Sequence, residues 1–152
     1  KQLPCRLAVQ FSVQEETGGS GAETGAFALQ PDEAIAVDVS FAPGPGVPEK
    51  IVARLGEGPL IGISSALSHR MSKVLEELAQ ENGIPYQLEV MGGATGTNAD
   101  NIVQAGGGAV TGLVSIAQRS MHTAVEIVSL ADVEATAQLL AAYVLKGGVC
   151  NG

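Results

Sequence analysis

The sequence predicts a layered α/β fold in one domain. Short apolar runs typical of strands alternate with segments in which apolar residues recur at helical spacing. Such alternation is typical of helices packed on a sheet. The length of 152 residues suits one domain, which would bury roughly 70% of the surface of its unfolded chain.

The predicted strands are five runs rich in β-branched and other apolar residues. They cover residues 6–13, 34–41, 60–64, 86–91 and 110–117. A loop is predicted at residues 41–50, where three prolines and two glycines follow the second strand.

Helices are predicted between these strands. The first, at residues 21–29, ends before Pro31, and a second, at residues 68–80, ends before Gly83 and Pro85. Another begins near Asn98. The second helix places these apolar residues at helical spacing: Met71, Val74, Leu75 and Leu78.

The final helix is predicted to begin at Ser129 and to end before Gly147. Ser129 is followed three residues later by Asp132, a spacing that resembles a capping box. One apolar stripe is expected to be buried, and it comprises Val133, Ala137, Leu140, Ala141 and Val144.

Composition excludes several classes of partner and location. Acidic residues outnumber basic ones 16 to 8, and no cluster of Lys or Arg could neutralise phosphates, so nucleic acid and anionic membranes are not expected as partners. No apolar run reaches the about 18 to 20 residues of a membrane span, and the start lacks a secretion signal. We therefore expect a cytoplasmic protein. Cys5 and Cys150 are expected to be free thiols.

Two adjacent carboxylates, Glu15 and Glu16, end the first predicted strand and precede a glycine-rich turn. Because successive strand residues point to opposite faces, one carboxylate could bind a metal while the other handles a proton. The alternative is a solvated turn that carries surface charge.

Asp38 and His122 lie at or near the ends of two other predicted strands. Asp38 sits among apolar residues and needs a cation or several donors, unless it only caps the proline-rich loop. His122 is either a surface residue or a partner of these carboxylates, whereas His69 is expected to be a surface residue. Strand ends are where α/β folds assemble sites, and carboxylate with imidazole is a zinc ligand set.

A glycine-rich loop at residues 92–97 precedes the helix that begins near Asn98. Its backbone N–H groups could cradle an anion at the helix N-terminus. It lacks the Lys-Ser/Thr of a P-loop, so a connecting turn is the other interpretation.

Taken together, a set of motifs resembles the tetrahedral, glutamyl-type aminopeptidases, metallopeptidase family 42, whose members are also described as endoglucanase-like. The motifs follow the family's order over almost the whole chain. They are Val13-Gln14-Glu15-Glu16, Gly18, Gly21-Ala22, Pro31-Asp32, Ala34-Ile35-Ala36-Val37-Asp38-Val39, Gly56-Glu57-Gly58-Pro59, Gly83-Ile84-Pro85-Tyr86-Gln87, Gly96-Thr97-Asn98-Ala99-Asp100 and Ser120-Met121-His122-Thr123.

The resemblance implies a metallo-aminopeptidase with two divalent metal ions, zinc or cobalt, that acts on short peptides as a homo-oligomer. The implied fold is a three-layer α/β/α sandwich with a mixed sheet, phosphorylase/hydrolase-like as in zinc peptidases. By the family's motifs, Glu15 is the general acid/base, Glu16 and His122 bind one metal, and Asp38 binds the other.

The chain departs from the family upstream of the glutamate pair. The His-x-Asp motif, the aspartate that bridges both metals and the insertion domain of the family are absent from these 152 residues. Asn98 and Ser120 stand where the family often has Asp and Tyr. Residues 1–152 are therefore expected to be the C-terminal portion of one catalytic domain, an incomplete fold that lacks its N-terminal half.

Three functions remain open from the sequence. The first is a fragment of an aminopeptidase, inactive alone and holding no metal or an incomplete set. The second is a non-catalytic assembly or binding module that kept the fold and lost the metals. The third is a nucleotide-binding domain that uses the loop at residues 92–97.

Overall fold

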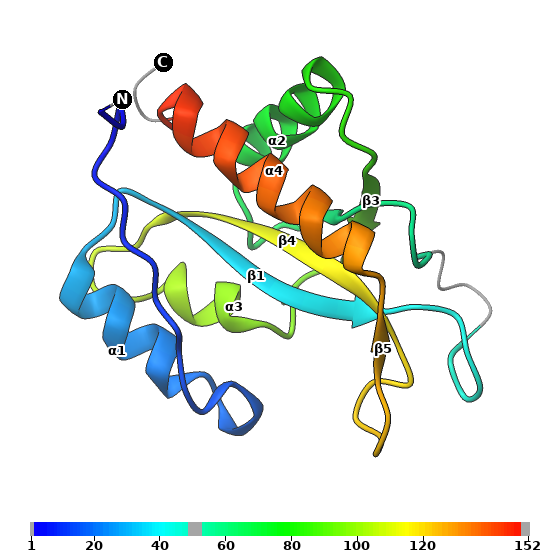
Figure 1. The fold of residues 1–152 in the computed structure, drawn as a ribbon. Helices are drawn as coiled ribbons and strands as arrows, with labels where there is room; N and C mark the ends of the chain where they lie inside the picture. Colours follow the sequence, from blue (N-terminus) through cyan, green and yellow to red (C-terminus); the bar gives the residue numbers. More distant parts are fainter. Residues whose placement is uncertain (1, 49–52, 150–152) are drawn as a thin grey trace.

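A five-stranded mixed sheet forms the centre of the protein in the computed structural model, which describes residues 2–48 and 53–149 (Figure 1). The strand order is β1-β4-β2-β3, and β5 pairs with β4. β1 and β4 are parallel, as are β2 and β3, whereas β2 and β5 are antiparallel to β4. The strands are β1 (Glu33–Phe41), β2 (Leu60–Ile63), β3 (Gln87–Val90), β4 (Val110–Arg119) and β5 (Ile127–Val128).

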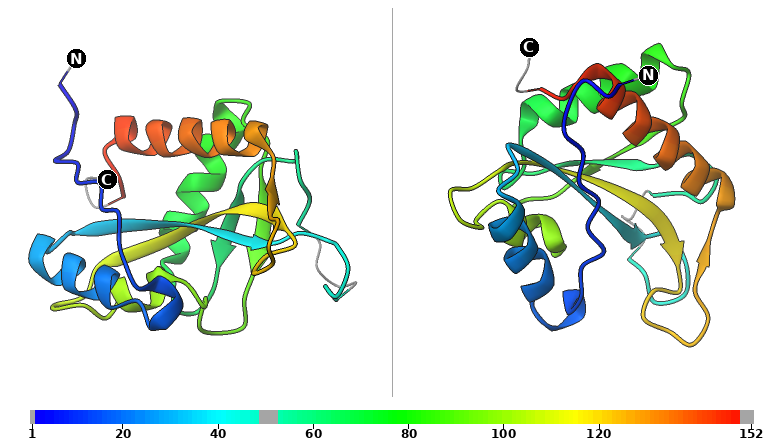
Figure 2. Two further views of the ribbon diagram at one scale, coloured as in Figure 1. Left: turned by 60° about the horizontal axis from the view of Figure 1, so that its bottom comes forward. Right: turned by 60° about the vertical axis from the view of Figure 1, so that its left-hand side comes forward.

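Helices cover both faces of this sheet and complete a three-layer α/β/α sandwich (Figures 1 and 2). α2 and α4 lie on one face, and α1 and α3 lie on the other. The predicted fold class is confirmed. The helices are η1 (Glu15–Thr17, a 3-10 turn), α1 (Ser20–Leu29), α2 (His69–Glu81), α3 (Asn98–Ile102) and α4 (Leu130–Lys146).

β4 is the strand that organises the core, because it is buried on both faces. Val114 packs with residues of α2 and α4, whereas its neighbour Leu113 packs with Ala99 of α3. A Cβ atom at Gly112 would lie 2.5 Å from the Met71 sulfur, so the glycine lets α2 approach β4 closely. This packing explains why apolar residues of β4 point to both faces of the sheet.

The first predicted strand, residues 6–13, is wrong. This segment is extended, but it pairs with no strand in the described part of the chain (Figure 2). The exposed fractions of its apolar residues are 51% at Leu7, 72% at Val9, 93% at Phe11 and 67% at Val13. The apolar pattern therefore satisfies the preference for a strand, but a strand also needs a neighbour to accept its backbone hydrogen bonds.

The buried face of α4 also differs from the prediction. Ala135, Leu139 and Tyr143 are buried on this helix, whereas Val133 is 40% exposed. Ala137 and Ala141 of the expected stripe are also exposed. Because apolar residues surround most of this helix, two stripes with the same spacing are available, and packing on the sheet selects one.

The capping box predicted for α4 is wrong as well. Ser129 is the N-cap residue, but its side chain accepts no capping hydrogen bond. The Asp132 carboxylate instead accepts hydrogen bonds from the backbone N–H groups of Gly56 and Gly58, at 2.8 and 2.9 Å. Asp132 is fully buried, so these amides replace the water that a carboxylate would otherwise require.

The remaining predicted elements are confirmed with shifts at their ends. Ser68 caps α2 by accepting a hydrogen bond from the N–H of Met71. Residues 42–48 form a loop after β1, and the end of the predicted loop lies outside the described residues. Cys5 is a free thiol, and Cys150 lies outside the described residues. No helix in the described part of the chain is long and apolar enough to cross a membrane.

Candidate metallopeptidase site

A cleft of about 390 Å³ lies at the carboxyl ends of β1 and β4. Its lining includes all four residues that the sequence singled out, Glu15, Glu16, Asp38 and His122. They come from η1, from β1 and from the loop after β4, which are far apart in the sequence. The parallel strands β1 and β4 bring Asp38 and the loop of His122 to one edge of the sheet. The 3-10 turn η1 adds Glu15 and Glu16 from outside the sheet.

Glu15 and Glu16 lie in the 3-10 turn η1, so the prediction that they end a strand is wrong. Gln14 before the turn has φ 62° and Gly18 after it has φ 114°, and these left-handed residues reverse the chain. The Asn101 side chain donates a hydrogen bond of 3.0 Å to the Gly18 carbonyl and ties the turn to α3. The turn keeps both carboxylates in the cleft although they do not alternate on a strand.

Glu16 and His122 form a close pair. The distance between Glu16 Oε1 and His122 Nε2 is 3.3 Å, and their side chains are 73% and 63% exposed. His122 has φ 61°, and its backbone N–H donates a 2.6 Å hydrogen bond to Glu126. Ser120, two residues earlier, also has a positive φ of 60°. Non-glycine residues held in this region carry strain that is typical of functional sites.

The Glu16 and His122 pair fits part of a metal site. Two donors bound tetrahedrally at about 2.0 to 2.1 Å from one zinc ion stand about 3.3 Å apart, which is the separation of these two atoms. The same distance is long for a hydrogen bond between charged groups. Within residues 2–48 and 53–149, however, no three His, Cys, Asp or Glu side chains gather as a metal-binding group.

Asp38 stands on β1 opposite Ser115 of β4 in the sheet register. Its Oδ1 accepts a 2.8 Å hydrogen bond from the N–H of Val39, so this bond does not cap the proline-rich loop. Burial raises the pKa of the Asp38 carboxyl, the Val39 N–H lowers it, and the negative charge of Glu16 raises it. A partly buried carboxylate with one local donor is suited to a cation.

Glu15 lies in the same electrostatic environment. Burial raises the pKa of its carboxyl above the ordinary value, and the charges of Asp38 and Glu16 raise it further, while His122 lowers it. Burial, together with repulsion from the neighbouring acids, therefore favours the protonated form of Glu15. A carboxyl group with a raised pKa holds a proton more readily than an ordinary one, as a general acid/base requires.

Three cleft residues were missed by the sequence interpretation, namely Ser40, Glu89 and Ser115. The Ser40 hydroxyl donates a hydrogen bond to the Glu89 carboxylate. Ser115 is 1% exposed, and its hydroxyl has no hydrogen-bond partner among the described residues. Only Ser115 carried a signal in the sequence, because it is a polar residue between Val114 and Ile116 in a strand expected to be buried.

The glycine-rich loop at residues 92–97 is not an open anion cradle. Both oxygens of the Asp100 carboxylate accept hydrogen bonds from the N–H of Thr95, at 3.0 and 2.9 Å, and one accepts from the N–H of Gly96 at 2.9 Å. The backbone donors that would bind a phosphate are occupied by a carboxylate of the chain itself. The structure therefore supports the interpretation of this loop as a connecting turn.

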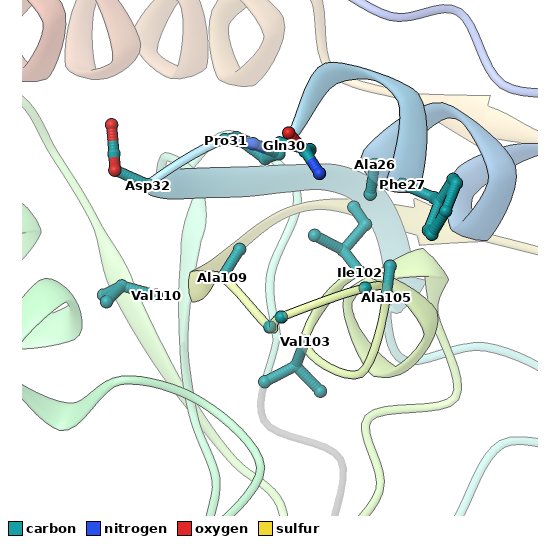
Figure 3. A pocket seen from close by; sticks show the side chains of 13 residues that line it. Ala26, Phe27, Gln30, Pro31, Asp32, Ile102, Val103, Ala105, Ala109 and Val110 are labelled. Atoms are coloured by element: carbon teal, nitrogen blue, oxygen red, sulfur yellow. The ribbon is translucent and has the colours of Figure 1, made fainter.

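A larger cavity, of about 680 Å³, lies at the opposite ends of β1 and β4 (Figure 3). Phe27 of α1 and Ile102 of α3 line it, and Asp32 is the only carboxylate among the described residues of its lining. Asp32 lies apart from these apolar side chains (Figure 3). The grouping of acid and imidazole side chains thus distinguishes the smaller cleft as the candidate site. His69, which is exposed on α2, lines neither cavity.

Replacing Asp38 by Asn should stabilise the metal-free protein at pH 7, and the gain should shrink as the pH falls towards 3.8, the ordinary pKa of the group. The folded state holds the Asp38 proton more tightly than the unfolded state, so ionisation of Asp38 lowers the free energy of unfolding as the pH rises. Urea unfolding in EDTA between pH 4 and 8 measures this difference. A difference between wild type and Asp38→Asn that does not change with pH would contradict the prediction.

Comparison with known proteins identifies the family of the chain. The sequence model of the M42 glutamyl aminopeptidases matches residues 1–139. The chain belongs to this family. The lysyl aminopeptidase of Pyrococcus furiosus is 39% identical to it over 134 residues, which are 88% of this chain and 38% of that protein.

Solved structures of family proteins share the fold. An aminopeptidase from the archaeon Desulfurococcus kamchatkensis matches with a TM-score of 0.80 and 35% identity, covering 89% of this chain and 40% of that one. The TET1 peptidase of Pyrococcus horikoshii matches with a TM-score of 0.70 and 28% identity, covering 90% and 40%. This M42 chain thus spans about 40% of the length of each of these three relatives.

Proposed function

We propose that the full-length natural protein is a metal-dependent aminopeptidase that removes N-terminal residues from short peptides. The observation that carries the proposal is the gathering of Glu15, Asp38 and the Glu16 and His122 pair in one cleft. The 3.3 Å between the two atoms of the pair supports a shared metal. Residues 1–152 are the C-terminal portion of its catalytic domain in this proposal.

Each residue has one role in the proposed site. Glu16 and His122 hold one divalent cation, zinc or cobalt, and Asp38 holds a second. When bound, such cations polarise the scissile carbonyl and lower the pKa of a water molecule. Glu15 takes the proton of the attacking water and delivers it to the leaving amine. Its raised pKa suits a group that must both accept and release a proton.

The ligand set of this chain is incomplete in the proposal. The pair supplies two donors and Asp38 supplies one, whereas a catalytic zinc usually has three protein ligands. We therefore expect the 152-residue chain alone to be inactive and to bind metal weakly. The full-length protein should hydrolyse aminoacyl p-nitroanilides with added Zn²⁺ or Co²⁺. Activity of the isolated chain would contradict the proposal that its ligand set is incomplete. A full-length protein that holds metal but is inactive would contradict the proposed peptidase activity.

A non-catalytic binding or assembly module is the second candidate. It is favoured by the lack of a three-residue metal-binding group in the described part of the chain. Metal analysis of the full-length protein separates the two functions, because the enzyme should carry close to two equivalents. Metal-free protein that stays metal-free after dialysis against Zn²⁺ would favour the module.

The proposal also covers the oligomeric state and the cellular location of the full-length protein. The solved TET1 peptidase of Pyrococcus horikoshii is described as assembling into a tetrahedron or a large octahedral shell. We propose that the full-length protein also forms a homo-oligomer and acts in the cytoplasm. The partners of the chain are then short peptides, further copies and the N-terminal half of its own catalytic domain, but neither nucleic acid nor membrane.

A further inference from the structure

We propose that Glu89, held by Ser40, selects substrates whose N-terminal residue has a positively charged side chain. This inference rests on the proposed function, because it places the side chain of the substrate relative to Asp38. Glu89 lies on β3, and its carboxylate accepts the hydrogen bond of the Ser40 hydroxyl on β1. Both residues line the cleft that contains the proposed metal ligands.

The charge of the cleft supports a cationic ligand. Glu15, Glu16, Asp38 and Glu89 are four carboxylates, and no Lys or Arg occurs among the described residues of the lining. Three of these acids have roles at the reacting centre in the proposed function. Glu89 has none there, so its negative charge remains in the cleft for the substrate to compensate.

The position of Glu89 indicates which part of the substrate it meets. Ser40 is two residues after Asp38 on β1, so both point to the same face and stand about 7 Å apart along the strand. The Ser40 hydroxyl therefore anchors Glu89 at roughly that distance from the metal ligand. This is too far for the amine next to the scissile bond, but it matches the about 6 Å reach of the four-carbon stem of lysine.

An independent observation indicates that the cleft binds a polar group. The hydroxyl of Ser115, a residue that is 1% exposed, has no hydrogen-bond partner among the described residues. Ser115 lines the same cleft and faces Asp38 across β1 and β4. A buried hydroxyl without a partner is costly, and a bound ligand would satisfy it.

The test compares L-lysine with L-norleucine, which has a side chain of similar shape without the ammonium group. Calorimetry on the metal-loaded full-length protein should give tighter binding of L-lysine, and Glu89→Gln should reduce that preference about 10- to 100-fold, the range for one charge-assisted hydrogen bond. Ser40→Ala should reduce it less, because Glu89 remains but loses its anchor. Glu77→Gln on the exposed face of α2 is the matched control and should change nothing.

Hydrolysis of lysyl and norleucyl p-nitroanilides by the same preparations gives the second measurement. The kcat/KM ratio of the two substrates should fall in Glu89→Gln while the norleucyl value is retained. Turnover without a preference for lysine, or an equal loss on both substrates, would overturn the role of Glu89 and leave the peptidase intact. Absence of all turnover would refute the peptidase, whereas the binding preference would still decide the role of Glu89.

Discussion

Replacing Glu15 by Gln should lower kcat of the full-length protein by about 10²- to 10⁴-fold, the usual contribution of one general acid/base. The amide keeps the shape of the side chain but can neither take nor return a proton. Metal content should stay close to that of the wild type, because the close partner of His122 is Glu16. Steady-state kinetics and metal analysis on one preparation measure both effects.

Glu16→Gln and Glu23→Gln are the controls for this prediction. Glu16→Gln should lose metal as well as activity, because it removes an anionic donor 3.3 Å from the imidazole. Glu23 is exposed on α1, outside the cleft, and its replacement should affect neither quantity. Loss of metal from Glu15→Gln, with retention in Glu16→Gln, would mean that the two roles are exchanged.

Replacing Asp132 by Ala should destabilise the protein by about 3 kcal/mol, because two backbone N–H groups lose their acceptor at a buried position. These are the amides of Gly56 and Gly58, and Asp132 itself is fully buried. The first turn of α4 also favours a carboxylate, since the N-terminus of a helix is partly positive. Urea and thermal unfolding measure the loss.

Glu134→Ala on the exposed side of the same helix is the matched control, and it should change the free energy of unfolding by less than about 0.5 kcal/mol. Asp132→Asn should fall between the two, because the amide oxygen can still accept one of the hydrogen bonds. If Asp132→Ala were no more damaging than Glu134→Ala, the Asp132 carboxylate would not be what holds the loop at Gly56 and Gly58.

The strand and helix predictions succeeded where local pattern and tertiary packing agree. β4 has apolar residues on both faces because both faces are buried, and α2 begins directly after Ser68 because that side chain caps it. Two predictions of packing failed, the strand at residues 6–13 and the buried stripe of α4. In both, the apolar pattern alone allows more than one packing arrangement. Residues 6–13 lack a neighbouring strand among the described residues, and α4 has two apolar stripes of equal spacing.

The four predicted site residues share one cleft, although the predicted geometry of Glu15 and Glu16 was wrong. The proximity of Asp38 and His122 could be anticipated, since the ends of parallel strands lie at one edge of an α/β sheet. The position of Glu15 and Glu16 could not be anticipated in this way, because they follow no strand. Glu89 and Ser40 could not be paired in advance. Two other strands separate β3 from β1 in the sheet, so the contact of their side chains depends on the tertiary structure.

The sequence by itself determined the alternation of helices and strands, the acidic character of the chain and the identity of the candidate acids and imidazole. These properties depend on residue type and on spacing over a few positions, which the chain carries without folding. Only the tertiary structure decided three hydrogen bonds. Asp132 accepts one from the distant loop at Gly56, Asp100 accepts one from the glycine-rich turn, and Glu89 accepts one from Ser40. Each of these hydrogen bonds forms because tertiary packing places a donor beside an acceptor, and buried polar groups must pair with each other in place of water.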